Sequence, residues 1–427
     1  MPKQRRAVVV GAGIGGLAAA GALVKDGWSV ELLESGHHVR GTGAGLGLWP
    51  NAVRAMDALD PAIGALGRGH PWTQESQQGA PDAVQAGSGP AFMLAQGGLR
   101  TPDGRWLTRI DATLLEEQSS GAPIIVTRTT LHAALASLVP AQSVRLGRTA
   151  TRVDLVGREA VVHAIGPDGQ EGNEEYAADL VVAADGIGSR LRATVDPRPS
   201  IRSAGYVTWR GIVPPEKSPA LEVGSETWGR GQRFGCTPLS SGGTYWYATL
   251  SHADPRAWSE DAEPGAGPDA EHQRDRLAGL FAGWHDPVPA LIAATPPDQV
   301  LRNDVVFLWP LPRTFVEGRL ALLGDAAHAM TPDLGQGACQ ALEDAVELAT
   351  SVRSAEPAGV PAALPTYDRL RHARATGLAR QARRLGQFSQ LRHPWAVAVR
   401  DKLISLVPAS SAAKGFAAAT AWRPSES

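Results

Sequence analysis

The chain has 427 residues, of which 43% are hydrophobic and 20% charged, with a formal net charge of −2. This composition is ordinary for a globular protein with room for two or more domains, and it gives no sign of a general attraction to nucleic acid or to an anionic membrane. The two cysteines, Cys236 and Cys339, exclude a disulfide scaffold and a cysteine metal cluster, and we predict no metal site. No apolar run is long enough to cross a bilayer, so a cytoplasmic location is expected.

The N-terminal segment reads as a strand, a glycine-rich turn, a helix and a second strand. A short β-branched run ends at Gly11, and Gly13 and Gly16 precede a helical pattern of apolar residues. In such a turn the first glycine allows the tight bend, the second lets a pyrophosphate approach the backbone, and the third lets helix and strand pack closely. The second strand ends at Glu34, whose carboxylate is placed to accept hydrogen bonds from ribose hydroxyls. This unit predicts a dinucleotide site and leaves the choice between NAD and FAD open.

A single arginine, Arg40, follows Glu34 by six residues and begins the glycine-rich stretch RGTGAGLGLWPNAVRAM. One hypothesis is that its guanidinium pairs with a phosphate of the cofactor or packs on the adenosine end. The alternative is a surface arginine, which is the ordinary role of an isolated one. The sequence alone leaves both interpretations open.

A second turn lies in the stretch DLVVAADGIGSRLR, residues 179–192. Residues 180–184 read as a buried strand that ends at Asp185, and Ser189 is placed to cap a following helix. Taken alone, this segment is better explained as an ordinary strand-to-helix turn than as a binding site.

A third turn, LALLGDAAHAMTPDLGQG, occupies residues 320–337. Its apolar strand ends beside Asp325, at the edge of an open α/β sheet where ligands bind. The helix that begins after Pro332, Gly335 and Gly337 carries its apolar residues mostly on one stripe. The N-terminus of this helix would stabilise the negative charge of a reduced flavin, and Asp325 could bind the ribityl hydroxyls. We therefore expect this segment to form the far wall of the nucleotide site.

The middle of the chain, residues 199–303, is rich in Trp, Tyr, Gly and Pro and alternates in the manner of strands. In the run TYWYATL, the period of two places Tyr245 and Tyr247 on one face and Trp246 on the other. Residues 254–270 read as a polar loop. The chain that follows the third turn reads as helices, and the basic side of RLRHARATGLARQARRL is interpreted as a solvated face.

The three turns, in this order, resemble the motifs of the single-component FAD-dependent aromatic monooxygenases. This is the family of para-hydroxybenzoate hydroxylase, salicylate hydroxylase and their zeaxanthin-epoxidase-like and urate-hydroxylase-like relatives. VVVGAGIGGLAAAGAL is similar to the family's dinucleotide fingerprint, ADGIGSRLR to its DG motif and LLGDAAHAMTPDLGQGACQALEDA to its GD motif. In VTRTTLHAAL, Arg128 matches an arginine that the family directs at the FAD. The resemblance runs from about residue 7 to 385 and is specific because the motifs occur together.

The resemblance implies an α/β fold with three parts. These are a Rossmann-like FAD-binding domain, a mostly antiparallel β-sheet substrate domain inserted into it, and a C-terminal helical segment. The Trp- and Tyr-rich middle of the chain agrees with the inserted sheet. We predict the FAD-binding domain at 1–75, 113–198 and 304–352, the substrate domain at 76–112 and 199–303, and the C-terminal helices at 353–427.

The resemblance also implies a reaction. NADPH or NADH reduces the FAD, O2 adds to form a C4a-hydroperoxide, and oxygen passes to an electron-rich carbon of an aromatic or heteroaromatic small molecule. No second nucleotide fingerprint for NAD(P)H is visible in the sequence, which is normal for this family. We expect a small-molecule aromatic substrate and O2 as partners and no nucleic acid. The identity of the substrate, the choice of nicotinamide and the oligomeric state are left open.

Individual residues around the reaction centre can also be named. Pro332, Gly335 and Gly337 are expected to border the isoalloxazine ring, as their positions in the third motif imply. Arg210, in TWRG, is the first candidate for a substrate contact because a guanidinium suits an anion or a phenolate. Tyr247 is expected nearby. The alternative is that Arg210 forms a structural ion pair and the tyrosine belongs to the core of the sheet, and the sequence does not choose between these interpretations.

Other functions on the same fold stay open. They include a flavin-dependent epoxidase or reductase acting on an isoprenoid or a polyketide, and a non-catalytic FAD-binding protein. A halogenase would need a lysine near its substrate, and Lys25 and Lys217 lie in unsuitable places. An ordinary NAD dehydrogenase would leave the third motif without a role. His328 is a conceivable base, although within DAAH it is better explained as fixing the turn.

Overall fold

The computed structural model describes residues 4–38, 45–68, 97–109, 124–167, 169, 174–221, 224–239, 243–252 and 270–425. Arg40 lies outside the described residues, as does the polar loop expected at 254–270 except for its last residue. That residue begins the helix α7 (Ala270–Phe281).

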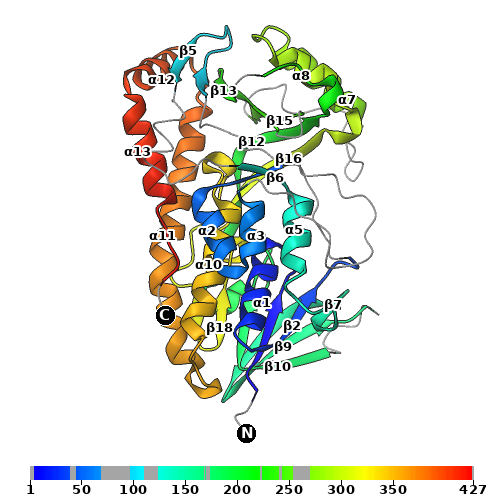
Figure 1. Ribbon diagram of the computed structural model, residues 1–427. Coiled ribbons are helices and arrows are strands. Elements are labelled where there is room, and N and C mark those ends of the chain that lie inside the picture. Colours follow the sequence, from blue (N-terminus) through cyan, green and yellow to red (C-terminus); the bar gives the residue numbers. More distant parts are fainter. Residues whose placement is uncertain are drawn as a thin grey trace.

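A six-stranded sheet in the order β17-β18-β11-β1-β2-β7 lies in the lower part of the molecule in Figure 1. All neighbouring pairs are parallel except β17 and β18 at one edge. The central strands are short runs of Val, Leu and Ala that are almost wholly buried, as is usual for a parallel sheet covered on both faces. The strands are β1 (Arg6–Val10), β2 (Ser29–Glu34), β7 (Val144–Leu146), β11 (Leu180–Ala183), β17 (Val316–Glu317) and β18 (Leu320–Leu322).

Helices and a small antiparallel sheet cover this parallel sheet. The helices α1 (Ile14–Lys25) and α10 (Gly337–Val352) pack against each other, because α1 consists largely of Gly and Ala and so allows a close approach. A Cβ atom added to Gly15 would lie 2.6 Å from the Leu323 side chain and 3.2 Å from the Ala341 Cβ. The remaining cover consists of α5 (Arg128–Ala136), β8 (Thr149–Val156), β9 (Glu159–Ile165) and β10 (Glu174–Ala178).

A seven-stranded sheet in the order β16-β12-β15-β14-β13-β4-β5 forms the upper part of the molecule (Figure 1). Every neighbouring pair is antiparallel except β13 and β4. On one face, Trp209, Phe234 and Trp246 form a core with α7 and α8 (Val288–Ala294). The strands are β4 (Gly98–Arg100), β5 (Trp106–Arg109), β12 (Ser200–Val213), β13 (Ser225–Trp228), β14 (Gln232–Pro238), β15 (Thr244–Ser251) and β16 (Leu301–Trp309).

Three helices end the chain. α11 (Val360–Ser389) packs along α10, α12 (Pro394–Leu406) lies beside β5, and α13 (Ala409–Thr420) runs back along the same side (Figure 1). The predicted fold class, a Rossmann-like sheet with a mostly antiparallel second sheet and C-terminal helices, is thereby confirmed. The exact domain boundaries remain a prediction. Short elements complete the structure: β3 (Gly45–Leu48), β6 (Ile124–Thr127), α2 (Pro50–Leu59), α3 (Pro61–Leu66), α6 (Arg192–Val195) and α9 (Asp325–His328).

The interpretation of the basic run in α11 as a solvated face is wrong for two of its arginines. Arg371 is fully buried and pairs with Glu343 and, at 2.7 Å, with Asp344. Arg374 pairs with Glu343 at 2.7 Å. Both carboxylates belong to α10. The arginines balance the negative charge of these buried acids, which the apolar pattern of α10 alone would place in solvent.

Candidate functional site

The turn between β1 and α1 has the steric features of a phosphate cradle. Gly11 adopts a φ of 100°, which a side chain would strain. A Cβ on Gly16 would lie 1.8 Å from the carbonyl oxygen of Gly11, so only glycine allows helix and strand to approach this closely. A Cβ on Gly13 would meet no atom of the described residues within 4 Å. The open space therefore lies at the middle glycine, where the backbone would meet a pyrophosphate.

Glu34 ends β2 beside this turn. Its Oε2 accepts a hydrogen bond from the Ala12 backbone N–H at 2.8 Å, and its Oε1 accepts one from Gly36 at 2.7 Å. The backbone therefore fixes the carboxylate next to the glycines. The Ser35 hydroxyl also donates to Oε1, at 3.2 Å, so Oε2 is the oxygen whose second lone pair can accept a bond from a ribose hydroxyl.

The second motif carries a buried acceptor. Asp185 follows β11, its Oδ2 accepts a bond from the Arg190 N–H at 3.1 Å, and its Oδ1 is buried without a hydrogen-bond partner among the described residues. Burial raises the pKa of this carboxyl group. Since a buried acceptor without a partner is costly, Asp185 fits a cofactor hydroxyl as its missing donor. Ser189 accepts a bond from the Arg192 N–H at 3.1 Å, but the N-cap of α6 is Leu191, so Ser189 holds the turn before the helix and its predicted capping role is wrong.

The second and third motifs are joined by one buried side chain, Arg192. Its guanidinium donates to the carbonyl of Ile187 at 2.8 Å and to that of Ala326 at 3.2 Å. Ala326 lies in α9, the short helix of the third motif. The resulting bridge holds Asp185 and Asp325 on loops that are fixed relative to each other.

In the third motif, Asp325 is exposed, and the residues on either side of it are held by a carboxylate of α10. Gly324 has a φ of 61° and donates its backbone N–H to the Oδ2 of Asp344 at 3.0 Å. The Nε2 of His328 lies 2.6 Å from the same oxygen. His328 is completely buried, so the structure places it in the turn and away from any open site.

The segment between α9 and α10 contains small residues that would allow a flat flavin ring to lie against the backbone. Pro332 is exposed. Gly335 has a φ of 62°, and a Cβ there would lie 3.0 Å from the Trp49 indole nitrogen. Gly337 starts α10 with open space where a side chain would be. These features fit the predicted flavin border at the N-terminus of a 16-residue helix.

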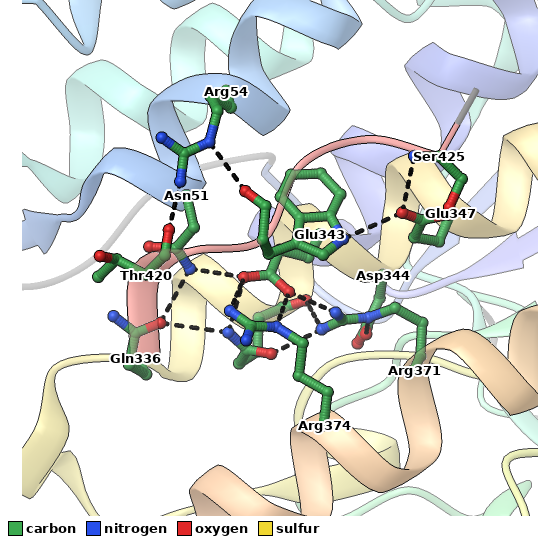
Figure 2. Close-up of polar contacts among 12 residues, drawn as sticks. Asn51, Arg54, Gln336, Glu343, Asp344, Glu347, Arg371, Arg374, Thr420 and Ser425 are labelled. Carbon is green, nitrogen blue, oxygen red and sulfur yellow. Dashed lines mark hydrogen bonds and ion pairs between the residues drawn. The ribbon is translucent and has the colours of Figure 1, made fainter. Parts of the chain in front are cut away.

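A buried polar network joins α10 to α2, α11 and the C-terminal segment (Figure 2). Glu343 accepts bonds from Asn51 at 2.6 Å and from Arg374 at 2.7 Å, and it also pairs with Arg371. The C-terminal segment joins this network, because Glu347 accepts bonds from the Trp422 indole at 3.0 Å and from a backbone N–H at residue 425 at 3.2 Å. The helix that would border the flavin is thus fixed by α2, α11 and the end of the chain.

The face of the seven-stranded sheet that is turned away from α7 and α8 carries the predicted substrate residues. Arg210 lies opposite Tyr247 in the β12–β15 register, and Tyr245 is two residues along on the same face. Trp246 lies on the opposite face, as predicted. Arg210 is partly exposed and donates to the Asn303 side chain at 2.9 Å, whereas its Nε is buried with no partner in the described part of the chain. Because Asn303 is uncharged, this contact is a hydrogen bond and not an ion pair.

Sequence reasoning missed a buried charge cluster on this face. Arg233 of β14 pairs with Glu226 of β13 and with Asp333, both at 2.5 Å. Burial alone would lower the pKa of Arg233, but the neighbouring Glu226, Tyr247 and Asp333 raise it overall. Tyr206 donates to Asp333 at 2.8 Å. Because Asp333 directly follows Pro332, this cluster ties the flavin-bordering segment to the substrate sheet.

The two tyrosines of the cluster are held neutral. Burial raises the pKa of Tyr206 and of Tyr247, and the nearby Asp333 and Glu226 respectively raise them further. Both phenols keep their protons, and these protons are engaged within the cluster, since Tyr206 donates to Asp333 and Tyr247 is paired with Glu226. The signal in the sequence was the strand QRFGCTP, where alternation places Arg233 on the same face as Gly235 and away from Phe234.

No contact of Arg128 with the three turns or with the charge cluster is recorded among the described residues. Arg128 is the first residue of α5 and is exposed, and its predicted contact with FAD stays a prediction. The same holds for Arg40, which lies outside the described residues.

The chain matches the family described as "FAD binding domain" over residues 4–261 and 311–382. The chain belongs to the FAD-dependent monooxygenases. It is 34% identical over 408 residues to the aurachin C monooxygenase/isomerase of Stigmatella aurantiaca, covering 94% of each chain. It is 32% identical to the 2-heptyl-3-hydroxy-4(1H)-quinolone synthase of Pseudomonas aeruginosa, covering 95% of this chain and 94% of that one.

The solved structure of Klebsiella pneumoniae HpxO complexed with FAD and uric acid is similar throughout. It has a TM-score of 0.81 and 28% sequence identity, and the match covers 99% of this chain and 98% of that one. The enzymes of this family hydroxylate aromatic or heteroaromatic compounds, which confirms the predicted class of enzyme, and the three turns described above fit FAD. Within the described ranges, no helix combines the length and the apolar character needed to span a bilayer.

Proposed function

We propose that this monooxygenase uses NADPH or NADH and O2 to hydroxylate a nitrogen heteroaromatic whose ring carries both an N–H group and a carbonyl or enolate oxygen. One observation carries the proposal. Glu226 shares one face of the sheet with Arg210 and Tyr247, and Arg233 joins this face to Asp333 in the segment that begins at Pro332. A ligand with both a donor and an acceptor is the natural complement of such a face.

The donor on this face is Arg210. The Nε of Arg210 is buried without a partner among the described residues, so an oxyanion could satisfy it. The hydroxyl of Tyr206 already donates to Asp333 at 2.8 Å and that of Tyr247 is paired with Glu226, so the two tyrosines shape the site and hold these carboxylates in place. The acceptor is Glu226, whose charge is balanced by Arg233 and whose side chain keeps some exposure, whereas the Asp333 side chain is completely buried and accepts from Arg233 and Tyr206.

The relatives support this substrate class. The Pseudomonas relative is named for a quinolone product, and the Klebsiella structure holds uric acid. 4(1H)-Quinolones and uric acid are nitrogen heterocycles that carry both a ring N–H group and a ring carbonyl oxygen. Such rings are electron-rich at a carbon next to the oxygen-bearing one, which is the position that an electrophilic oxygen attacks.

The chain's own residues would divide the work as follows. Gly11, Gly13 and Glu34 would hold the nucleotide end of FAD, and Asp185 and Asp325 the ribityl region. When bound, FAD accepts a hydride from the nicotinamide and activates dioxygen. The residues of the sheet face bind the ring, fix which carbon faces the cofactor and keep water away from it.

The experiment compares oxygen uptake and NAD(P)H oxidation with and without a panel of quinolones, purines and simple phenols. A nitrogen heterocycle should stimulate both rates and gain one oxygen atom by mass. Arg210→Ala should keep its FAD and raise the apparent KM for that compound by about tenfold, the value of one charged hydrogen bond. Arg202→Ala, an exposed arginine on the same strand, serves as the matched control. Stimulation by phenols alone, or an unchanged KM in Arg210→Ala, would contradict the proposal.

A further inference from the structure

The helix α12 presents an unusually apolar face to the outside. Trp395, Val399, Leu403 and Leu406 follow one another at spacings of four, four and three residues, which places them on one stripe. They are 66%, 50%, 53% and 64% exposed, and Val407 continues the stripe at 47%. Five of the ten large hydrophobic side chains that are exposed in the described part of the chain lie on this stripe. An apolar group of this extent marks an interaction surface.

The orientation of α12 is fixed by its opposite side. Arg400 is completely buried and donates to the carbonyl of Ser389 at 3.0 Å. It also pairs with Asp401 at 2.8 Å and lies over the Trp228 ring at 5.5 Å. The buried arginine anchors the helix to the end of α11 and to β13. Because these contacts fix one side of α12 against the protein, the apolar stripe on its other side faces outward.

Cations surround the stripe, although the chain as a whole carries a charge of −2. Lys402 is exposed and follows Trp395 by seven residues, which places it on the same side of the helix. Arg105 and Arg109 are exposed at the two ends of β5, which packs beside α12 (Figure 1), and Lys414 is exposed on α13. The charge of Asp401 is offset by Arg400. Asp103, in the turn before β5, is an exposed acid, so among the described residues on these elements the exposed cations outnumber the exposed acids.

We propose that α12 seats this protein on an anionic lipid bilayer, with the apolar stripe at the depth of the headgroups and the surrounding cations on lipid phosphates. An apolar face with aromatic and aliphatic residues and basic neighbours is the composition that binds reversibly to such a surface. A second copy of the chain fits the same surface less well. A stable dimer buries about 800 Å² on each partner, more than a few side chains supply, and a two-fold axis through the stripe would bring the Lys402 side chains together.

Vesicle flotation of the FAD-loaded full-length protein tests this inference. The wild type should float with vesicles of phosphatidylcholine and phosphatidylglycerol, and it should bind pure phosphatidylcholine more weakly. Leu403→Ser with Leu406→Ser should weaken binding by more than about tenfold, because two leucines that would enter the bilayer are lost. Lys402→Glu should weaken binding by at least about fivefold on the anionic vesicles only, since a charge is reversed. Leu370→Ser, at an exposed leucine of α11, is the matched control and should float as the wild type does.

Three outcomes would overturn the inference. The wild type could stay out of the vesicle fraction for every lipid composition. The leucine variant could float as well as the wild type. The wild type could be a dimer by light scattering that dissociates in the leucine variant without any vesicle binding, which would assign the stripe to a second copy. The flavin absorbance of each variant shows that it is folded, and Lys402→Glu provides an independent arm that leaves the apolar stripe intact.

Discussion

The Nε2 of His328 lies 2.6 Å from the Oδ2 of Asp344, in a completely buried position behind the loop that presents Asp325. The same carboxylate accepts the backbone N–H of Gly324 at 3.0 Å and pairs with Arg371 at 2.7 Å. One acid of α10 therefore fixes both ends of α9 and connects them to α11. Asp344 is the residue on which the position of the third motif depends most directly.

Asp344→Asn should destabilise the protein by about 3 kcal/mol or more, because it leaves the buried Arg371 with one carboxylate fewer. It should also weaken FAD binding, since the Gly324 turn loses part of its anchor. Urea unfolding and flavin fluorescence titration measure the two effects. Asp304→Asn, whose side chain is 53% exposed, is the control and should change neither. Equal stability of Asp344→Asn and the wild type would contradict the account of this loop.

Asp344 also predicts how stability depends on pH. Burial alone would raise the pKa of this carboxyl group, but His328 and Arg371 lower it to about 2 from an ordinary value of 3.8. A carboxyl with a lowered folded pKa contributes stability above its unfolded pKa and loses it as the pH falls towards the folded value. The difference in unfolding free energy between the wild type and Asp344→Asn should be constant above about pH 5 and shrink between about pH 4 and pH 2. A difference that grows as the pH falls would contradict the sign of this effect.

Two glycines of the first motif should respond differently to alanine. Gly16→Ala should destabilise the fold by about 2 kcal/mol or more, because its Cβ would lie 1.8 Å from the Gly11 carbonyl oxygen, a backbone atom with no room to move. Gly13→Ala should fold normally, since its Cβ meets no described atom within 4 Å, but it should bind FAD at least about tenfold more weakly. Thermal unfolding of the apoprotein and a flavin titration separate the two. If Gly13→Ala keeps full FAD affinity, the phosphates do not approach this glycine.

Asp185 and Asp325 should both be needed for tight FAD binding. Replacing either by alanine should weaken the affinity by about tenfold, the value of one charged hydrogen bond to a cofactor hydroxyl. Asp185→Ala should cost little stability, because it loses the bond from the Arg190 N–H but also removes the buried Oδ1 that has no partner within the described residues. Asp298→Ala, an exposed acid far along the chain, is the control for both. FAD affinities that match the control would remove these two acids from the site.

Arg233 should behave as the centre of a coupled cluster. Arg233→Met should destabilise the protein by about 3 kcal/mol, because Glu226 and Asp333 are left buried and unbalanced. Adding Asp333→Asn should restore part of that loss, so the two changes should not be additive. Urea unfolding of the single and double variants measures the coupling. Additive effects would show that Arg233 and Asp333 act independently.

The sequence was a good guide wherever a local pattern determines a local structure. The strand, the turn and the helix around Gly11 lie where the glycine spacing places them. The helix that follows Gly335 likewise begins at Gly337. In β15, the period of two correctly separated Trp246 from its two tyrosine neighbours.

The failures arose where distant segments meet. α10 reads as a helix with one apolar stripe, yet Glu343, Asp344 and Glu347 on its polar side are also buried. They are buried because α11 and the last residues of the chain cover them, and no local pattern encodes that contact (Figure 2). Arg233 was missed for the same reason, since its partner Asp333 is 100 residues away in the chain.

The visible absorbance spectrum of the purified protein tests the central claim most directly. It should be followed through anaerobic addition of NADPH or NADH with a nitrogen heterocycle present, and then through the admission of air. We predict oxidised-flavin bands that bleach on reduction and return with oxygen, together with a product heavier by one oxygen atom. A colourless protein that takes up no added FAD would contradict the account, because the three turns would then have no cofactor to hold.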